Sequence, residues 1–144
     1  MRIWHYSLLP YLPELQFKGQ LRELMAIMRD WRDKGQTNHI LINRVTEYPK
    51  SDLVSYFVAY EVEFFARYGV QHMDKLDQFA EFLGSERLKS PPFVGWHDRD
   101  YLRVCMANLY EKHKFGLGKS RITDKEWSVL LDGYKKITNE DYEI

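Results

Sequence analysis

One glutamate in the first predicted helix has surroundings that suit acid–base chemistry. Glu23 lies about 100° around the helix from Arg22, at the edge of that helix's apolar stripe. Lys18, Arg22 and Arg29 follow at spacings of four and seven residues and share one basic stripe. A carboxylate at this edge can be half-buried against whatever packs alongside it, whereas the alternative is a solvated charge beside a basic face. No local cation is available to Glu23, since the positions three and four residues away hold Gly19, Gln20, Ala26 and Ile27.

Three other motifs lack the context that their chemistry requires. Residues 116–120 (Gly-Leu-Gly-Lys-Ser) resemble the end of a phosphate-binding loop, but position 113 is His instead of the required Gly, and a helix precedes the motif. No two of the five His are four residues apart, as a helical metal site needs, and the single Cys has no Cys partner. Cys105 lies on the apolar stripe of a predicted helix, where a thiol is inert packing. The sequence therefore predicts neither a metal ion nor an organic cofactor.

The elements that position these residues are predicted to be helices of one domain. Residues 1–13 hold two prolines and are expected to form an extended arm. Apolar residues recur at helical spacing from Phe17 to Trp31, and Gly35 is expected to end that first helix. The other expected helices, each marked by a capping residue or a Gly, run from Ser51 to Gly69, from about Met73 to Leu83, from Asp98 or Asp100 to Gly116, and onward from Thr123. The predicted fold class is all-α, with residues 1–144 as a single domain and residues 139–144 as an acidic, frayed tail.

Met1-Arg2-Ile3 at the N-terminus and Arg22-Glu23-Leu24 in the first helix are two short motifs with counterparts in a known family. With them the chain resembles the pyrimidine-dimer DNA glycosylases, the ultraviolet-damage enzymes of the phage endonuclease V type. Weaker similarity runs through residues 52–68, 94–98 and 109–112, and the segment with Asn38, His39 and Arg44 resembles bacterial relatives. The resemblance spans residues 1–113, so residues 114–144 are expected to be a C-terminal helical extension.

The resemblance implies a small all-α fold whose N-terminal arm packs between helices, and it implies a repair activity. Members cleave the glycosidic bond of a damaged nucleotide with their terminal α-amine and then break the strand by β-elimination. Here the Met1 amine matches the nucleophile and Glu23 matches the catalytic acid, while Arg2 and Arg22 match arginines that hold DNA near the reacting sugar. The remaining candidate contacts to nucleic acid are Lys18, Arg29, His39, Arg44 and His97.

An α-amine is chemically suited to this role. Its unperturbed pKa of about 7.7–8.0 leaves a useful neutral fraction at cellular pH, whereas a Lys amine titrates near about 10.4. The neutral amine attacks C1′ of the sugar to form an imine, which acidifies the 2′ proton, and a nearby carboxylate stabilises the cationic sugar. Because residue 2 is Arg, which is not small, methionine aminopeptidase is expected to leave Met1 in place.

Composition and charge bound these expectations. The chain has 144 residues with 21 Lys and Arg against 21 Asp and Glu, so its zero net charge gives no general argument for nucleic-acid binding. Residues 1–50 carry a balance of +3, residues 51–100 of −4 and residues 101–144 of +1. The densest basic run, either a second contact to a nucleic-acid backbone or a solvated helix end, holds Lys112, Lys114, Lys119, Arg121 and Lys125.

Cysteine usage and hydropathy suggest where the chain works. One Cys, no signal peptide and no long apolar run lead us to expect a cytoplasmic, membrane-free protein, associated with the nucleoid if bacterial. We expect a monomer whose partner is damaged double-stranded DNA.

Departures from the family pattern leave other functions open. The phage-type enzyme is basic and has a basic, aromatic tail, whereas this tail is acidic. Ala26 stands where the family has a further Arg one turn after the catalytic Glu. Because fewer phosphate contacts weaken binding, an abasic site, another lesion, RNA or a nucleotide fragment are open as substrates. The alternatives are a non-catalytic helical module that binds nucleic acid or protein, and a lyase that acts on another aldehyde or sugar.

Overall fold

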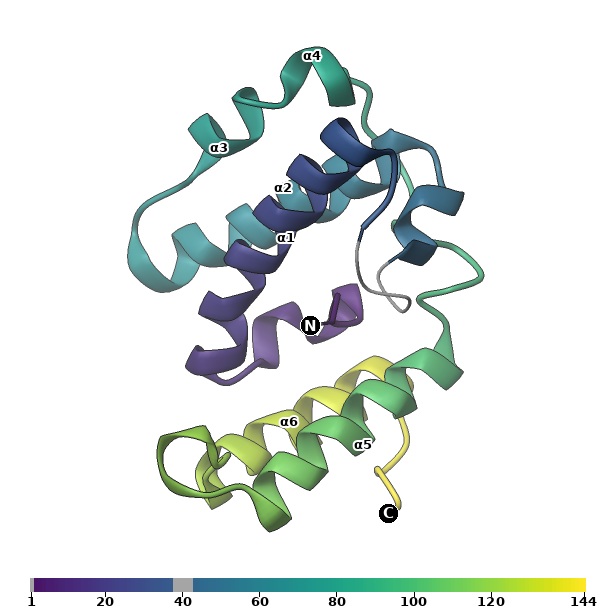
Figure 1. Cartoon of the computed structure of the whole chain (residues 1–144). Coiled ribbons are helices and arrows are strands. Elements are labelled where there is room, and N and C mark those ends of the chain that lie inside the picture. Colours follow the sequence, from purple (N-terminus) through teal and green to yellow (C-terminus); the bar gives the residue numbers. More distant parts are fainter. Residues whose placement is uncertain (1, 38–42) are drawn as a thin grey trace.

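The computed structural model describes residues 2–37 and 43–144, which fold into helices and contain no β-strand (Figure 1). The α-helices of these residues are α1 (Glu14–Lys34), α2 (Lys50–Tyr68), α3 (Met73–Asp77), α4 (Ala80–Leu83), α5 (Arg99–Phe115) and α6 (Asp124–Thr138). The 3-10 helices are η1 (Tyr6–Tyr11), η2 (Asn43–Glu47) and η3 (Gly118–Ser120). The predicted all-α class is confirmed.

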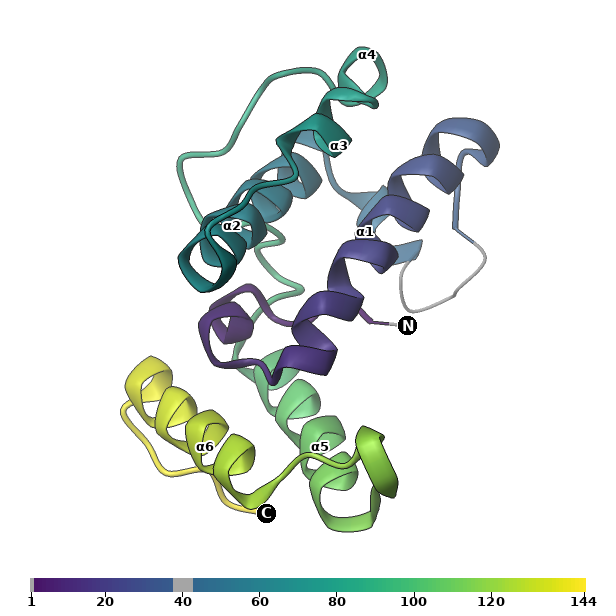
Figure 2. The same cartoon turned by 90° about the vertical axis from the view of Figure 1, so that its left-hand side faces the viewer.

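Two pairs of long helices enclose the N-terminal segment. Figures 1 and 2 show α1 beside α2 and α5 beside α6, with residues 2–11 between the two pairs. η1 packs against both α2 and α6 and contributes the buried Leu8 and Leu9. Phe17 of α1 and Tyr60 of α2 stack with ring centroids 4.6 Å apart, and both side chains are fully buried. The arm therefore packs between helices, as the resemblance implies.

Local signals begin or end three of these helices where the sequence predicts, but Ser51 does not cap α2, which begins at Lys50 after Pro49. Gly35 adopts a left-handed conformation with φ of 75°, and its N–H donates to the carbonyl four residues earlier across 3.0 Å. The Asp98 side chain accepts from the Tyr101 N–H at the start of α5. Thr123 and Glu126 form both hydrogen bonds of the predicted capping box. Gly35 thus defines where α1, the helix that carries Glu23, ends.

The N-terminal segment is less extended than predicted. Residues 2–5 lie outside a helix, but residues 6–11 form η1. A proline φ near −65° suits both extended and 3-10 backbone, so the two prolines alone do not separate these conformations. The helical turn is stabilised by two buried leucines and by His5, whose side chain accepts from the Ser7 N–H. The predicted helix over residues 73–83 is likewise interrupted, because the backbone of Phe79, between α3 and α4, has φ of −111° and ψ of 11° and is not helical.

The acidic tail is docked, and the prediction of a frayed end was wrong. The Tyr142 ring packs edge-on against Tyr134 of α6, with centroids 5.2 Å apart. Arg103 of α5 donates to the Glu143 carbonyl oxygen across 3.3 Å. Tail composition alone did not reveal this packing, because both partners lie more than five residues away on other elements.

Replacing Gly133 by Ala is expected to lower the free energy of unfolding by up to about 2 kcal/mol, which is an overpacking cost of about 1–3 kcal/mol less a helix-propensity gain of about 1 kcal/mol. A Cβ at this position of α6 would lie 2.4 Å from Cγ of Tyr11, so the ring or the helix must shift. Urea denaturation measures the change. The matched control is Gly19→Ala in α1, where nothing lies within 4 Å of the added Cβ and only the gain remains. Equal behaviour of the two variants would contradict the close approach.

Candidate active site

A buried amide in α1 joins the arm to the rest of the site. Gln20 is fully buried, and its Nε2 donates to the Arg2 carbonyl oxygen at 3.0 Å and to Oε2 of Glu23 at 2.9 Å. Its Oε1 accepts from the Trp4 N–H at 2.9 Å and lies 3.0 Å from the Tyr56 hydroxyl. Both amide N–H groups of Gln20 donate, and its carbonyl oxygen accepts at least one hydrogen bond. Gln20 therefore fixes two arm residues and one carboxylate relative to each other.

Two tyrosine hydroxyls hold the arm from the opposite helices. Tyr56 of α2 donates to the Trp4 carbonyl oxygen at 2.6 Å, and Tyr101 of α5 donates to the Ile3 carbonyl oxygen. Ile3 is itself fully buried. Residues 2–4 are therefore held from α1, α2 and α5, and the arm cannot slide along its own axis without breaking several of these hydrogen bonds.

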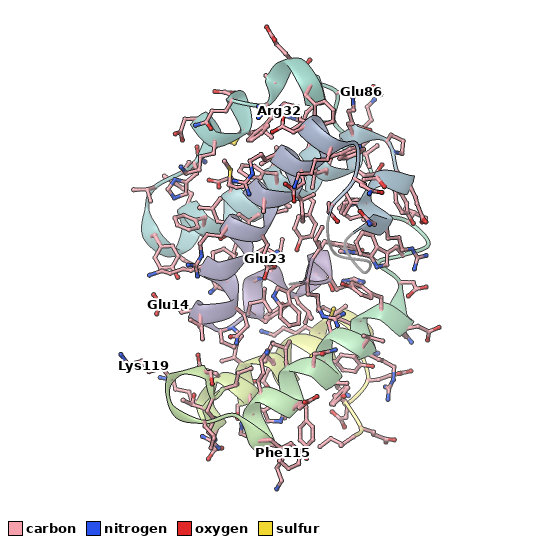
Figure 3. The ribbon with its side chains drawn as sticks, in the orientation of Figure 1. Glu14, Glu23, Arg32, Glu86, Phe115 and Lys119 are labelled. Carbon is pink, nitrogen blue, oxygen red and sulfur yellow. The ribbon has the colours of Figure 1, made fainter. Side chains whose placement is uncertain are left out.

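The Glu23 carboxylate is half-buried where the arm meets α1 (Figure 3). Its Oε2 accepts from the Arg2 backbone N–H at 3.3 Å as well as from the Gln20 amide. Burial raises the pKa of Glu23 above the ordinary 4.5, and the hydrogen bond from the Arg2 N–H opposes that rise. The carboxylate therefore holds a proton more readily than an exposed glutamate, and it lies beside the backbone of the residue that follows Met1.

The basic residues predicted on α1 differ in whether their charge is paired within the protein. Arg22 and Arg29 are exposed, and Arg22 is the chain neighbour of Glu23. Lys18 pairs with Glu14 at 2.8 Å, and its ammonium lies 5.0 Å from the centroid of the Tyr68 ring. An anion that reaches Lys18 must therefore compete with a carboxylate, whereas Arg22 is open to solvent beside the site.

The other predicted contacts lie on the arm and η2. Arg2 is half-buried, with its guanidinium 6.0 Å from the centroid of the Trp4 ring. Arg44 of η2 donates to the Gly95 carbonyl oxygen at 3.3 Å and lies 5.8 Å from the Trp96 ring. The structure thus brings the backbone of Arg2 to Glu23 and places Arg44 on η2, against Gly95 and Trp96. Two further candidates, Met1 and His39, lie outside the described residues.

His97 has its ring inside the protein. It is buried, and its Nδ1 accepts from the Tyr6 N–H at 3.1 Å. Burial lowers the pKa of His97 to about 2 and the pKa of His5 to about 4. His5 Nε2 in turn donates to the His97 carbonyl oxygen at 2.9 Å. Both imidazoles are therefore neutral links between the arm and the start of α5, and the buried His97 ring is not open to DNA.

These two histidines are expected to make the fold acid-sensitive. In the unfolded chain they take up protons near pH 6.5, whereas in the folded chain burial delays that step to about pH 4 and about pH 2. The contribution of the two histidines to the free energy of unfolding is therefore fully present above pH 6.5. It falls as the pH drops below 6.5, by roughly 3 kcal/mol per histidine at pH 4. Urea denaturation from pH 7.5 to 4.5 measures the slope. His97→Asn keeps an acceptor for the Tyr6 N–H and should flatten the slope; an unchanged slope would contradict the assignment.

Sequence reasoning missed the residues that position the arm. Gln20 lies between Phe17 and Leu24 on the buried face of α1, so a polar residue in an apolar stripe was the available signal. Tyr56 and Tyr101 gave none, because each is an ordinary apolar-face residue until its hydroxyl partner is known. Among the described residues, no three His, Cys, Asp or Glu side chains are grouped to hold a metal ion. No helix in the described ranges is long and apolar enough to cross a bilayer.

Comparison with known proteins identifies a family whose model matches the part of the chain that contains Glu23. A family model described as pyrimidine dimer DNA glycosylase matches residues 1–76, which include the arm, α1 and α2. The match therefore contains Glu23 and Gln20 but ends before α5. No curated protein and no solved structure matches the chain.

Proposed function

The chain belongs to the pyrimidine dimer DNA glycosylase family, and on that premise we propose that it cleaves damaged DNA through an imine formed by the Met1 α-amine. One observation carries the proposal. The half-buried Glu23 carboxylate accepts a hydrogen bond from the Arg2 N–H, and only three covalent bonds separate that nitrogen from the α-amine of Met1. A carboxylate with a raised pKa is thereby kept close to the chain position of the proposed nucleophile.

The proposed reaction starts with attack of the neutral amine on C1′ of the damaged nucleotide. The C1′–N bond to the base breaks as the new C1′–N bond forms, and opening of the sugar ring gives the imine. The imine is an electron sink, so removal of a 2′ proton expels the 3′ phosphate and breaks the strand. Water then hydrolyses the imine and frees the amine. Glu23 stabilises the positive charge on the sugar and carries protons to and from the amine.

DNA is held by arginines on both sides of this centre in the proposal. Arg2 lies on the arm segment that Gln20 and Tyr101 fix, and Arg22 is exposed next to Glu23 in α1. Guanidinium groups bind phosphate oxygens in pairs and set the position of the strand. Arg29 and Arg44 extend the same role to flanking phosphates, and Lys18 contributes when Glu14 releases it.

Borohydride trapping tests the proposal directly. Protein with an unmodified N-terminus is incubated with an abasic-site duplex or a pyrimidine-dimer duplex in the presence of borohydride, which reduces the imine to a stable amine. The expected result is a slow-migrating covalent adduct on a denaturing gel whose modified peptide begins at Met1. A lesion-free duplex is the control. Absence of an adduct, where a known lyase gives one, would leave the non-catalytic binding module as the function.

A further inference from the structure

The turn between α5 and α6 concentrates positive charge on a neutral protein. Residues 112–125, here called the basic hairpin, contain one acidic residue, Asp124, against five basic ones. The basic members are Lys112, Lys114, Lys119, Arg121 and Lys125. A local balance of +4 on a chain with zero net charge makes this segment a strong local source of positive potential.

Most of this charge is not neutralised within the protein. Arg121 lies 3.3 Å from Asp124, but within the described residues no ion pair is formed by the four lysines. Of the two carboxylates that flank the hairpin, Glu111 forms no ion pair among the described residues, and Glu126 accepts from the Thr123 N–H in the capping box. The lysine ammonium groups are therefore available to an external polyanion.

The basic hairpin is also rigidly built. A Cβ on Gly116 would lie 2.2 Å from the Lys112 carbonyl oxygen, so the backbone is closely packed at this point. The His113 ring bonds the Ile122 carbonyl oxygen through Nδ1 at 2.8 Å and stacks on Trp127 with an interplanar angle of 9°. This packing holds two apolar side chains at the tip, Phe115 and Leu117, 72% and 84% exposed.

Glu23 and the basic hairpin lie on the same side of the molecule. Figures 1 and 2 agree that α1 and α5 form one side and that α2 and α6 form the other. Figure 3 shows Lys119 and Phe115 beyond the end of α1 that carries Glu14, on the side from which Glu23 is seen. A rod-shaped polyanion that crosses α1 along this side would reach the basic hairpin.

We propose that the basic hairpin is a second contact for duplex DNA, in which its lysines bind backbone phosphates flanking the lesion. Duplex DNA presents one negative charge per about 1.7 Å of axis, which suits several flexible ammonium groups that have no fixed acceptor. The inference rests on the proposed function for the identity of the polyanion. It lies outside residues 1–76, so the family match does not supply it.

A four-lysine variant of the full chain tests this contact. Affinity for an abasic-site duplex is measured against salt concentration for K112Q/K114Q/K119Q/K125Q and for a control that loses the same charge elsewhere, K75Q/K89Q/K135Q/K136Q. The hairpin variant is expected to lower the slope of log affinity against log salt by about 3–4, at about 0.9 per phosphate contact, and to bind at least tenfold more weakly. The control is expected to change the slope by less than about 1.

The two proposals fail separately in this experiment. The hairpin variant should still give the borohydride adduct at low salt and saturating DNA, because its lysines lie outside the reacting centre. An unchanged slope, or an equal loss in the control, overturns the hairpin contact even if the adduct forms. Loss of the adduct in the unsubstituted chain with a normal salt slope overturns the imine mechanism instead. Circular dichroism melting curves confirm that both variants are folded.

Discussion

One extra residue in front of Met1 is expected to lower the rate of borohydride-trapped adduct formation by at least about 100-fold. The added residue moves the terminal amine by up to about 3.6 Å along the chain. Displacement of a reacting group by only about 1 Å is enough for a loss of this size. The arm cannot shift back to compensate, because Gln20, Tyr56 and Tyr101 hold the backbone of residues 2–4 by hydrogen bonds.

The comparison depends on the state of the N-terminus. Intact-mass measurement of the unextended protein should show Met1 with a free amine, and the trapped peptide should carry its added mass on that residue. A protein with one extra residue after Ile144 serves as the control and should form adduct at the original rate. If the N-terminally extended protein forms adduct equally fast, the nucleophile is a lysine or another group and not the Met1 amine.

Helix ends that depend on contacts between residues close in sequence could be predicted from the sequence. Gly35 and the Thr123 capping box end and begin helices through contacts within four residues, so their signals can be read along the chain. The tail was mispredicted for the opposite reason. Tyr142 and Glu143 are held by α6 and α5, and composition near residue 140 carries no trace of those partners.

The candidate site divides in the same way. The position of Glu23 at the margin of the apolar stripe, without a cation in its own helix, follows from helical spacing alone. Its hydrogen bond to the Arg2 N–H joins residues 21 positions apart and could not be read from spacing. His97 was predicted to contact nucleic acid because residues 94–98 resemble the family, whereas its buried ring accepts a hydrogen bond from the Tyr6 N–H. Gln20, a polar residue within the apolar stripe of α1, was a local signal of the site that sequence reasoning missed.

Glu23→Gln is expected to reduce the rate of adduct formation by a factor of about 10²–10⁴ while the fold is retained. Both hydrogen bonds to Glu23 are received by one oxygen, Oε2, so the carbonyl oxygen of a glutamine can accept both of them. The variant keeps the contacts to Arg2 and Gln20 but loses the negative charge and the proton-carrying function. Single-turnover trapping on an abasic-site duplex, at saturating protein, separates this chemical effect from weaker binding.

Glu23→Gln is expected to keep or raise the stability of the fold while it lowers the rate of adduct formation. Because burial raises the pKa of Glu23 in the folded state, the stability that it contributes is present at low pH and is lost as the pH rises through that pKa. At pH 7 the ionised carboxylate therefore costs stability, and Glu23→Gln is expected to unfold at an equal or higher urea concentration. Glu14→Gln is the matched control, because this exposed carboxylate pairs with Lys18 and has a lowered pKa. It should lose little stability and no activity.

We expect a carboxylate that lowers stability beside the start of the chain to be kept for function and not for packing, because natural proteins depart from local stability rules mainly at functional sites. If Glu23→Gln loses stability and keeps the rate of adduct formation, the carboxylate is a structural anchor for the arm, and the proton carrier must be sought elsewhere.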